Sequence, residues 1–140
     1  MMKLLQILTT ISLISCSVAK PLPKNPTLSD EIVARVTYYW PGDSGQSGRK
    51  TSTGNIAKGG KTIAVDPRII PYGSKVHIPT MQKIFVAHDT GTAVRSRKAS
   101  KKVGKNNIVV DVFCENKYEA YRRMKQYPMF MKIKIEKPTK

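Results

Sequence analysis

Short segments rich in β-branched and aromatic residues recur along the chain from residue 33, and Gly, Pro, Asn or Asp residues lie between them. Segments of this length and composition are typical of β-strands. They span residues 33–40, 63–65, 75–78, 84–88, 108–113 and 129–135. Several short strands separated by turns favour a closed barrel. Because 140 residues leave room for little more than one domain, the sequence predicts one small, mainly β domain.

One short helix is expected between the last two strands. Asn116 can cap the first turn, and Glu119 follows three residues later, as a capping box requires. Ala120, Tyr121 and Met124 then follow at helical spacing. This spacing predicts an apolar stripe through about Met124.

The first residues resemble an export signal. Lys3 precedes an apolar run over residues 4–13, which is too short to span a bilayer but suits a secretory signal. Residues 13–16 (LISC) match a lipobox, which would make Cys16 the lipidated first residue, and Ala19 ends a second cleavage motif. We expect a lipoprotein-type signal over residues 1–16, or cleavage near Ala19. A buried N-terminal strand or helix is the alternative.

A proline-containing segment over residues 17–30 follows the signal. Its polar, extended composition predicts a flexible tether. At about 3.1 Å per residue, the tether would hold a domain roughly 40 Å from a membrane. The folded domain is therefore expected over residues 31–140. We expect an exported monomer in the cell envelope or periplasm, bound to the membrane only through a lipid at Cys16.

The chain is strongly basic, with a formal net charge of +16 at pH 7. Six basic residues fall within 11 positions: Arg95, Arg97, Lys98, Lys101, Lys102 and Lys105. We expect this basic segment, residues 95–105, to be a surface loop that binds anionic envelope polymers, with a solvated face as the alternative. Nucleic acid is the usual partner of such charge in the cytosol. The export signal argues against nucleic acid here.

Cysteine and histidine are scarce. Two Cys exclude a disulfide-stapled mini-domain, and the two His, His77 and His88, leave little material for a metal centre. No metal or other cofactor is therefore predicted. If Cys16 is lipidated, Cys114 has no partner and is expected to be a small buried apolar residue.

Three aspartates lie inside or at the ends of apolar β segments, namely Asp66, Asp89 and Asp111. Burial of a carboxylate costs free energy unless the group is hydrogen-bonded or neutralised. Burial also raises a carboxyl pKa toward the range of a general acid. Structural roles are the alternative for two of them. Asp66 could cap a turn before Pro67, and Asp89 could form an Asx-turn with Gly91. Asp111 interrupts a Val/Ile run in mid-strand, which a structural role explains less well.

The residues around these aspartates carry a family resemblance. The chain resembles the bacterial three-aspartate ("3D") domain, which is related to the barrel of membrane-bound lytic transglycosylase A and to stationary-phase survival muralytic proteins. The matching stretches are STG at 52–54, IAVDPRIIPYGSKVHIP at 63–79, VAHDTGTAV at 86–94 and VVDVF at 109–113. The resemblance, over residues 36–135, implies a six-stranded double-psi β-barrel. It also implies cleavage of the β-1,4 bond between N-acetylmuramic acid and N-acetylglucosamine in peptidoglycan, leaving a 1,6-anhydro end.

The resemblance also implies residue roles. Asp111 matches the aspartate that acts as general acid and then as base, and Asp89 matches the second catalytic aspartate, which supports it. The substrate-binding residues that it implies are Asp66, Thr53, Gly54, Thr90 and Gly91. One carboxyl group suffices for this reaction, because the sugar's own 6-hydroxyl replaces water as the attacking group.

The sequence departs from the family pattern at two places. Thr92 stands where the family commonly has a second Gly after DTG, and 22 positions separate Asp89 from Asp111, more than in typical members. Two further functions stay open. One is a non-catalytic barrel that binds glycan strands, and the other is a basic protein that binds nucleic acid or a membrane surface. A carboxyl group inside an apolar strand favours the enzyme, because a binding module has no need of it.

Overall fold

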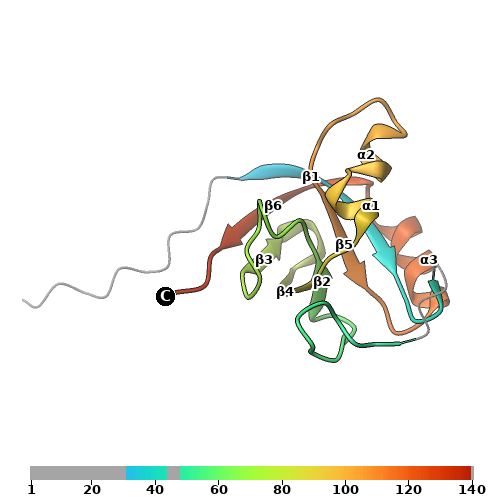
Figure 1. The fold of residues 1–140 in the computed structure, drawn as a ribbon. Helices are drawn as coiled ribbons and strands as arrows, with labels where there is room; N and C mark the ends of the chain where they lie inside the picture. Colours follow the sequence, from blue (N-terminus) through green and yellow to red (C-terminus); the bar gives the residue numbers. More distant parts are fainter. Residues whose placement is uncertain (1–30, 44–47, 140) are drawn as a thin grey trace, which may run out of the picture.

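The computed structural model describes residues 31–43 and 48–139 (Figure 1). The signal peptide over residues 1–16, the lipidation of Cys16, the cleavage near Ala19 and the tether over residues 17–30 lie outside the described residues and stay predictions. In the described part of the chain, no helix combines the length and the hydropathy that a membrane span requires.

Six strands and three α-helices make up the described domain (Figure 1). The strands are β1 (Ile32–Tyr39), β2 (Thr62–Ala64), β3 (Lys75–Ile78), β4 (Lys83–Asp89), β5 (Val109–Phe113) and β6 (Phe130–Glu136). The helices are α1 (Thr92–Arg95), α2 (Lys98–Lys101) and α3 (Lys117–Gln126), with one 3₁₀ turn, η2 (Pro79–Met81). Each predicted strand is confirmed, with boundaries that differ by no more than one residue.

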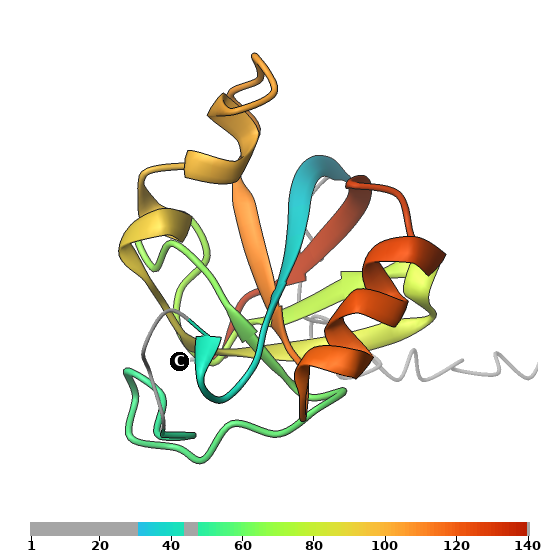
Figure 2. The same cartoon turned by 90° about the vertical axis from the view of Figure 1, so that its right-hand side faces the viewer.

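The strands close into a barrel in the order β1-β5-β2-β4-β3-β6. Two neighbouring pairs are parallel, β1 with β5 and β2 with β4, and the other four are antiparallel. The first three strands correspond to the last three, β1 to β4, β2 to β5 and β3 to β6. When corresponding strands are interchanged, the same pairs form with the same parallel or antiparallel direction. The two halves of the chain are thus equivalent and interlocked, which is the predicted double-psi arrangement. Figure 2 shows α3 on one side of the barrel and α1 and α2 on the other.

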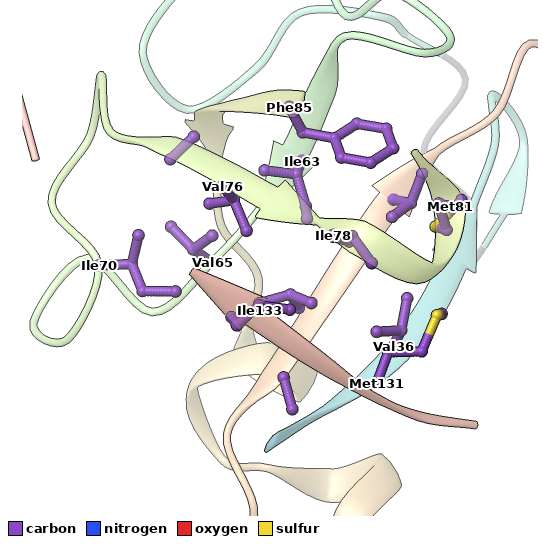
Figure 3. Packing of buried hydrophobic residues seen from close by; sticks show 14 of the residues in the cluster. Val36, Ile63, Val65, Ile70, Val76, Ile78, Met81, Phe85, Met131 and Ile133 are labelled. Atoms are coloured by element: carbon purple, nitrogen blue, oxygen red, sulfur yellow. The ribbon is translucent and has the colours of Figure 1, made fainter. Parts of the chain in front are cut away.

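Alternating residues of each strand fill the barrel. On β1 the side chains of Val36 and Tyr38 are buried in the core, whereas Thr37 and Tyr39 lie on the opposite, outer face. Figure 3 shows side chains from β1, β2, β3, β4 and β6 meeting in the interior, with fully buried Phe85 among them. Burial of each large apolar side chain stabilises the fold by about 1.5–3 kcal/mol. The outer face is therefore the one that is free to carry polar groups.

The predicted helix is confirmed as α3, with a correction to its buried face. The Asn116 side chain accepts a hydrogen bond from the backbone N–H of Glu119, as a capping residue does. Ala120 is fully buried, but Tyr121 and Met124 are exposed, at 51% and 44%. The expected apolar stripe is therefore wrong beyond Ala120. α3 lies on the outside of a closed barrel, so most of its side chains face solvent.

The basic segment, residues 95–105, differs from the surface loop that was expected. Residues around it form α1 and α2, each one turn long, and both helices contact β5. Val94 and Ser100 are buried, and Val94 packs with Val109 of β5. Helices of one turn leave no apolar period in a sequence, so a pattern of spacing cannot show them. Five of the six basic side chains are nevertheless exposed, and Arg97 is partly buried.

Candidate active site

Asp111 lies at the centre of β5, on the outer face of the barrel. Its neighbours Val110 and Val112 point into the core, so the alternation of the strand directs Asp111 outward. Thr37 is its register partner on β1, and the Thr37 hydroxyl donates a 2.8 Å hydrogen bond to Asp111 Oδ1. Asp111 lines a cavity on this face.

A β-bulge brings Asp89 to the same outer face. In the parallel pairing of β2 with β4, Ile63 lies opposite Ala87 but the next residue, Ala64, lies opposite Asp89. His88 is the extra residue, because plain alternation would place Asp89 on the core face with Ala87. Bulges redirect a side chain in this way beside many active sites.

The Asp89 carboxylate accepts four hydrogen bonds. Its Oδ1 receives the backbone N–H and the hydroxyl of Ser52, at 2.9 and 2.8 Å, and the backbone N–H of Thr90, at 2.9 Å. Its Oδ2 receives the Tyr39 hydroxyl at 2.8 Å. Burial, together with Asp89, raises the pKa of Tyr39, so the phenol stays protonated and keeps donating. Asp89 is therefore held in one position from both sides.

Ala64 lies between the two carboxyl groups. It is the register partner of Asp89 on one side and of Asp111 on the other. Two strand spacings therefore separate the two aspartate backbones, roughly 10 Å. A methyl group is the only side chain between them, and Ala64 lines the cavity. The small residue thus leaves a gap into which both carboxyl groups face.

The cavity has a volume of about 500 Å³. Asp43, Arg49 and Lys50 line it together with Asp89 and Asp111, so it carries charges of both signs. This size is typical of a site for a small molecule or a short stretch of polymer. In residues 31–43 and 48–139, no three His, Cys, Asp or Glu side chains are grouped so that they could hold a metal ion.

The pKa of Asp111 is raised from its ordinary value of 3.8 to about 7. Burial is the main cause, because a charged carboxylate loses hydration there. The negative charges of Asp43 and Asp89 raise the pKa further, and the hydrogen bond from Thr37 lowers it. Near neutral pH, Asp111 can therefore give up a proton and also take one back.

Asp66 is not brought together with the other two aspartates. It forms a two-point ion pair with Arg68, at 2.9 and 2.7 Å, and accepts the backbone N–H of Arg68 at 3.1 Å. The Arg68 hydrogen bond is the main cause that holds the Asp66 pKa below its ordinary value. Asp66 lines a separate pocket beside α1 and α2. The alternative of a turn cap, not the substrate-binding role, is what this geometry supports.

The other predicted site residues divide into two pairs. Thr90 and Gly91 line the cavity, whereas Thr53 and Gly54 do not. The Thr53 hydroxyl donates to the carbonyl oxygen of His88 at 2.7 Å, which fixes the loop beside the bulge. Gly54 has a φ of +85°, a conformation that favours glycine. These two residues therefore position the loop that carries Ser52.

Sequence reasoning missed several residues of this site, among them Thr37, Tyr39, Asp43 and Ser52. Ser52 stands in the STG motif, so the motif indicated the right loop but not the side chain that reaches Asp89. Thr37 and Tyr39 stand two positions apart in a strand, and this spacing places both on one face. No signal in the sequence indicated which face that would be.

A comparison with known families identifies the domain. The model of the 3D domain matches residues 61–134, more than half of the chain, and this range contains Asp66, Asp89 and Asp111. The chain belongs to the 3D domain family.

Two curated relatives come from Bacillus subtilis (strain 168). The chain is 36% identical over 99 residues to the cell wall-binding protein YocH, and the aligned region covers 69% of this chain and 30% of YocH. It is 40% identical over 89 residues to the putative cell wall shaping protein YabE, and the aligned region covers 61% of this chain and 19% of YabE. The chain thus spans less than a third of either relative. A solved structure of the lytic transglycosylase LtgG of Burkholderia pseudomallei aligns with a TM-score of 0.36 and 20% identity, over 63% of this chain and 25% of that one.

Proposed function

We propose that this protein cleaves peptidoglycan as a lytic transglycosylase, at the β-1,4 bond between N-acetylmuramic acid and N-acetylglucosamine. One observation carries the proposal. A protonatable carboxyl group, Asp111, faces a cavity of about 500 Å³ with its pKa raised to about 7. Membership of the 3D domain family, and relatives described as cell wall-binding and cell wall shaping, support peptidoglycan as the substrate.

The reaction needs one proton donor that later becomes an acceptor. The Asp111 carboxylic acid gives its proton to the glycosidic oxygen as the bond from that oxygen to the anomeric carbon of N-acetylmuramic acid breaks. The 6-hydroxyl of the same sugar then attacks the anomeric carbon, and the Asp111 carboxylate takes up its proton. The product is a 1,6-anhydro end and a free hydroxyl on the departing strand. The residue ends in its starting protonation state.

Asp89 has a supporting role in this proposal. Its charge faces the gap beside Ala64, where a positive charge would develop at the anomeric carbon. The hydrogen bonds from Tyr39, Ser52 and Thr90 keep it in place as an acceptor. A fixed negative charge near Asp111 also contributes to the raised pKa of that acid. Thr90 and Gly91 are then the substrate contacts of the cavity wall.

Location and partners follow from the same proposal. The protein acts as an exported monomer on glycan strands in the cell envelope, with a membrane anchor only if Cys16 is lipidated. The exposed basic side chains of residues 95–105 bind anionic envelope polymers.

A glycan-binding barrel without catalysis is the second candidate. The description of the relative YocH as a cell wall-binding protein favours it. The deciding experiment incubates purified sacculi with the protein and with Asp111→Asn, followed by mass spectrometry of the released muropeptides. Anhydro-muropeptides from the wild type but not from the variant would support the enzyme. Binding to sacculi without any release by the wild type would favour the binding module.

A further inference from the structure

Trp40 lies at the edge of the candidate active site. It is the single tryptophan of the sequence and directly follows β1. Its ring is partly buried against the core, and the residue lines the cavity. The backbone N–H of Asp43 donates to the Trp40 carbonyl oxygen at 2.9 Å, which closes a tight turn between the two residues. Core packing and this turn hold Trp40 beside the cavity.

Tyr121 extends this aromatic surface away from the cavity. Its ring centroid lies 5.8 Å from that of Trp40, with the ring planes tilted by 55°. Tyr121 is 51% exposed, although it belongs to α3, which packs against β1. Figure 1 and Figure 2 both show α3 beside the end of β1. Two adjoining rings thus offer a partly open surface that continues the cavity wall.

A polymeric substrate needs such a surface. A cavity of about 500 Å³ encloses only a short stretch of a glycan strand. The sugars on either side of the enclosed stretch must therefore lie on the protein surface. Pyranose rings carry an apolar face of C–H groups, and these groups pack on aromatic faces while the hydroxyl groups stay hydrated.

We propose that Trp40 and Tyr121 form an aromatic platform that binds the glycan strand outside the cavity. The ligand class rests on the proposed function, but the platform requires binding only and not cleavage. It is continuous with the cavity through Trp40, which belongs to both. The occupant is a run of β-1,4-linked N-acetylated hexosamines that extends from the cavity across α3.

The test uses the fluorescence of the single tryptophan. The Asp111→Asn protein lacks the proton donor of the proposed reaction, so it serves as a background in which the strands should stay intact. It is titrated with the N-acetylglucosamine disaccharide and with the hexasaccharide. The hexasaccharide should change the Trp40 emission and bind more tightly than the disaccharide. Adding Tyr121→Ala should weaken hexasaccharide binding roughly three- to tenfold and leave disaccharide binding nearly unchanged.

Two variants control for general effects. Tyr121→Phe keeps the ring and should bind like the background protein. Tyr118→Ala removes a tyrosine of the same helix that is 75% exposed and contacts Lys117 rather than Trp40, and it should also have no effect. Circular dichroism confirms that each variant is folded.

The outcomes separate this inference from the proposed function. Unchanged hexasaccharide binding by Tyr121→Ala would overturn the platform, and so would the absence of any Trp40 emission change with the hexasaccharide. Neither result bears on whether the wild type releases anhydro-muropeptides from sacculi. Conversely, a length-dependent loss in Tyr121→Ala supports the platform even if the wild type releases nothing.

Discussion

Replacement of the candidate general acid should make the protein more stable at neutral pH. Asp111→Asn removes a carboxyl group that must lose its hydration when it ionises in the folded state. Its pKa is raised from 3.8 to about 7 in the native protein. Between these two values the unfolded chain releases the proton while the native protein keeps it. The contribution of Asp111 to the free energy of unfolding is therefore at its highest below pH 3.8, and it falls as pH rises toward 7.

The size of the effect follows from the two pKa values. Compared with a carboxyl group that stays protonated, Asp111 lowers the free energy of unfolding by about 1 kcal/mol at pH 4.5 and by about 4 kcal/mol at pH 8.5. The free energy of unfolding of Asp111→Asn minus that of the wild type should therefore increase by about 3 kcal/mol from pH 4.5 to pH 8.5. Packing costs of the amide are the same at both pH values, so they cancel in this comparison.

Equilibrium urea unfolding of both proteins at pH 4.5 and 8.5 measures the effect. A difference between the two proteins that does not change with pH would refute the assignment of a raised pKa to Asp111. Asp66→Asn is the matched control of opposite sign, because Arg68 lowers the pKa of Asp66. The stability that Asp66 supplies is present above pH 3.8 and is lost only as pH falls below that value, so this variant should be destabilised by nearly the same amount at pH 8.5 and at pH 4.5.

Three more changes test other parts of the molecule. Thr37→Val removes the hydrogen bond that lowers the Asp111 pKa, so the alkaline limit of muropeptide release should move upward by about one unit in a pH–rate profile; an unmoved limit would contradict Asp111 as the acid. Cys16→Ala should turn a membrane-pelleting protein into a soluble or unprocessed one, and identical fractionation of both forms would favour cleavage near Ala19. Reversing the exposed basic charges should weaken sacculus binding at low salt while the melting temperature stays nearly unchanged; binding that does not depend on salt would contradict this role. The residues to replace by Glu are Lys98, Lys101, Lys102 and Lys105.

Local sequence patterns predicted the strands and the start of α3, and they singled out Asp111 as a candidate. Strands and caps depend on neighbours within a few positions, so alternation, turn residues and the Asn116–Glu119 spacing predict them. An ionisable residue inside an apolar strand is visible in the same way. Asp111 therefore stood out before any fold was known.

The residues that surround Asp111 come from distant parts of the chain, so they could not be predicted from local patterns. Thr37 is 74 positions away from Asp111, and Tyr39 is 50 positions away from Asp89. Barrel closure brings them together, because strand order and register depend on pairing between distant segments. The bulge at His88 directs Asp89 outward, whereas Asp66 pairs with Arg68 and lines a separate pocket. The sequence shows three aspartates in β segments, whereas the tertiary structure places Asp111 and Asp89 at one cavity and Asp66 beside another pocket, in an ion pair with Arg68.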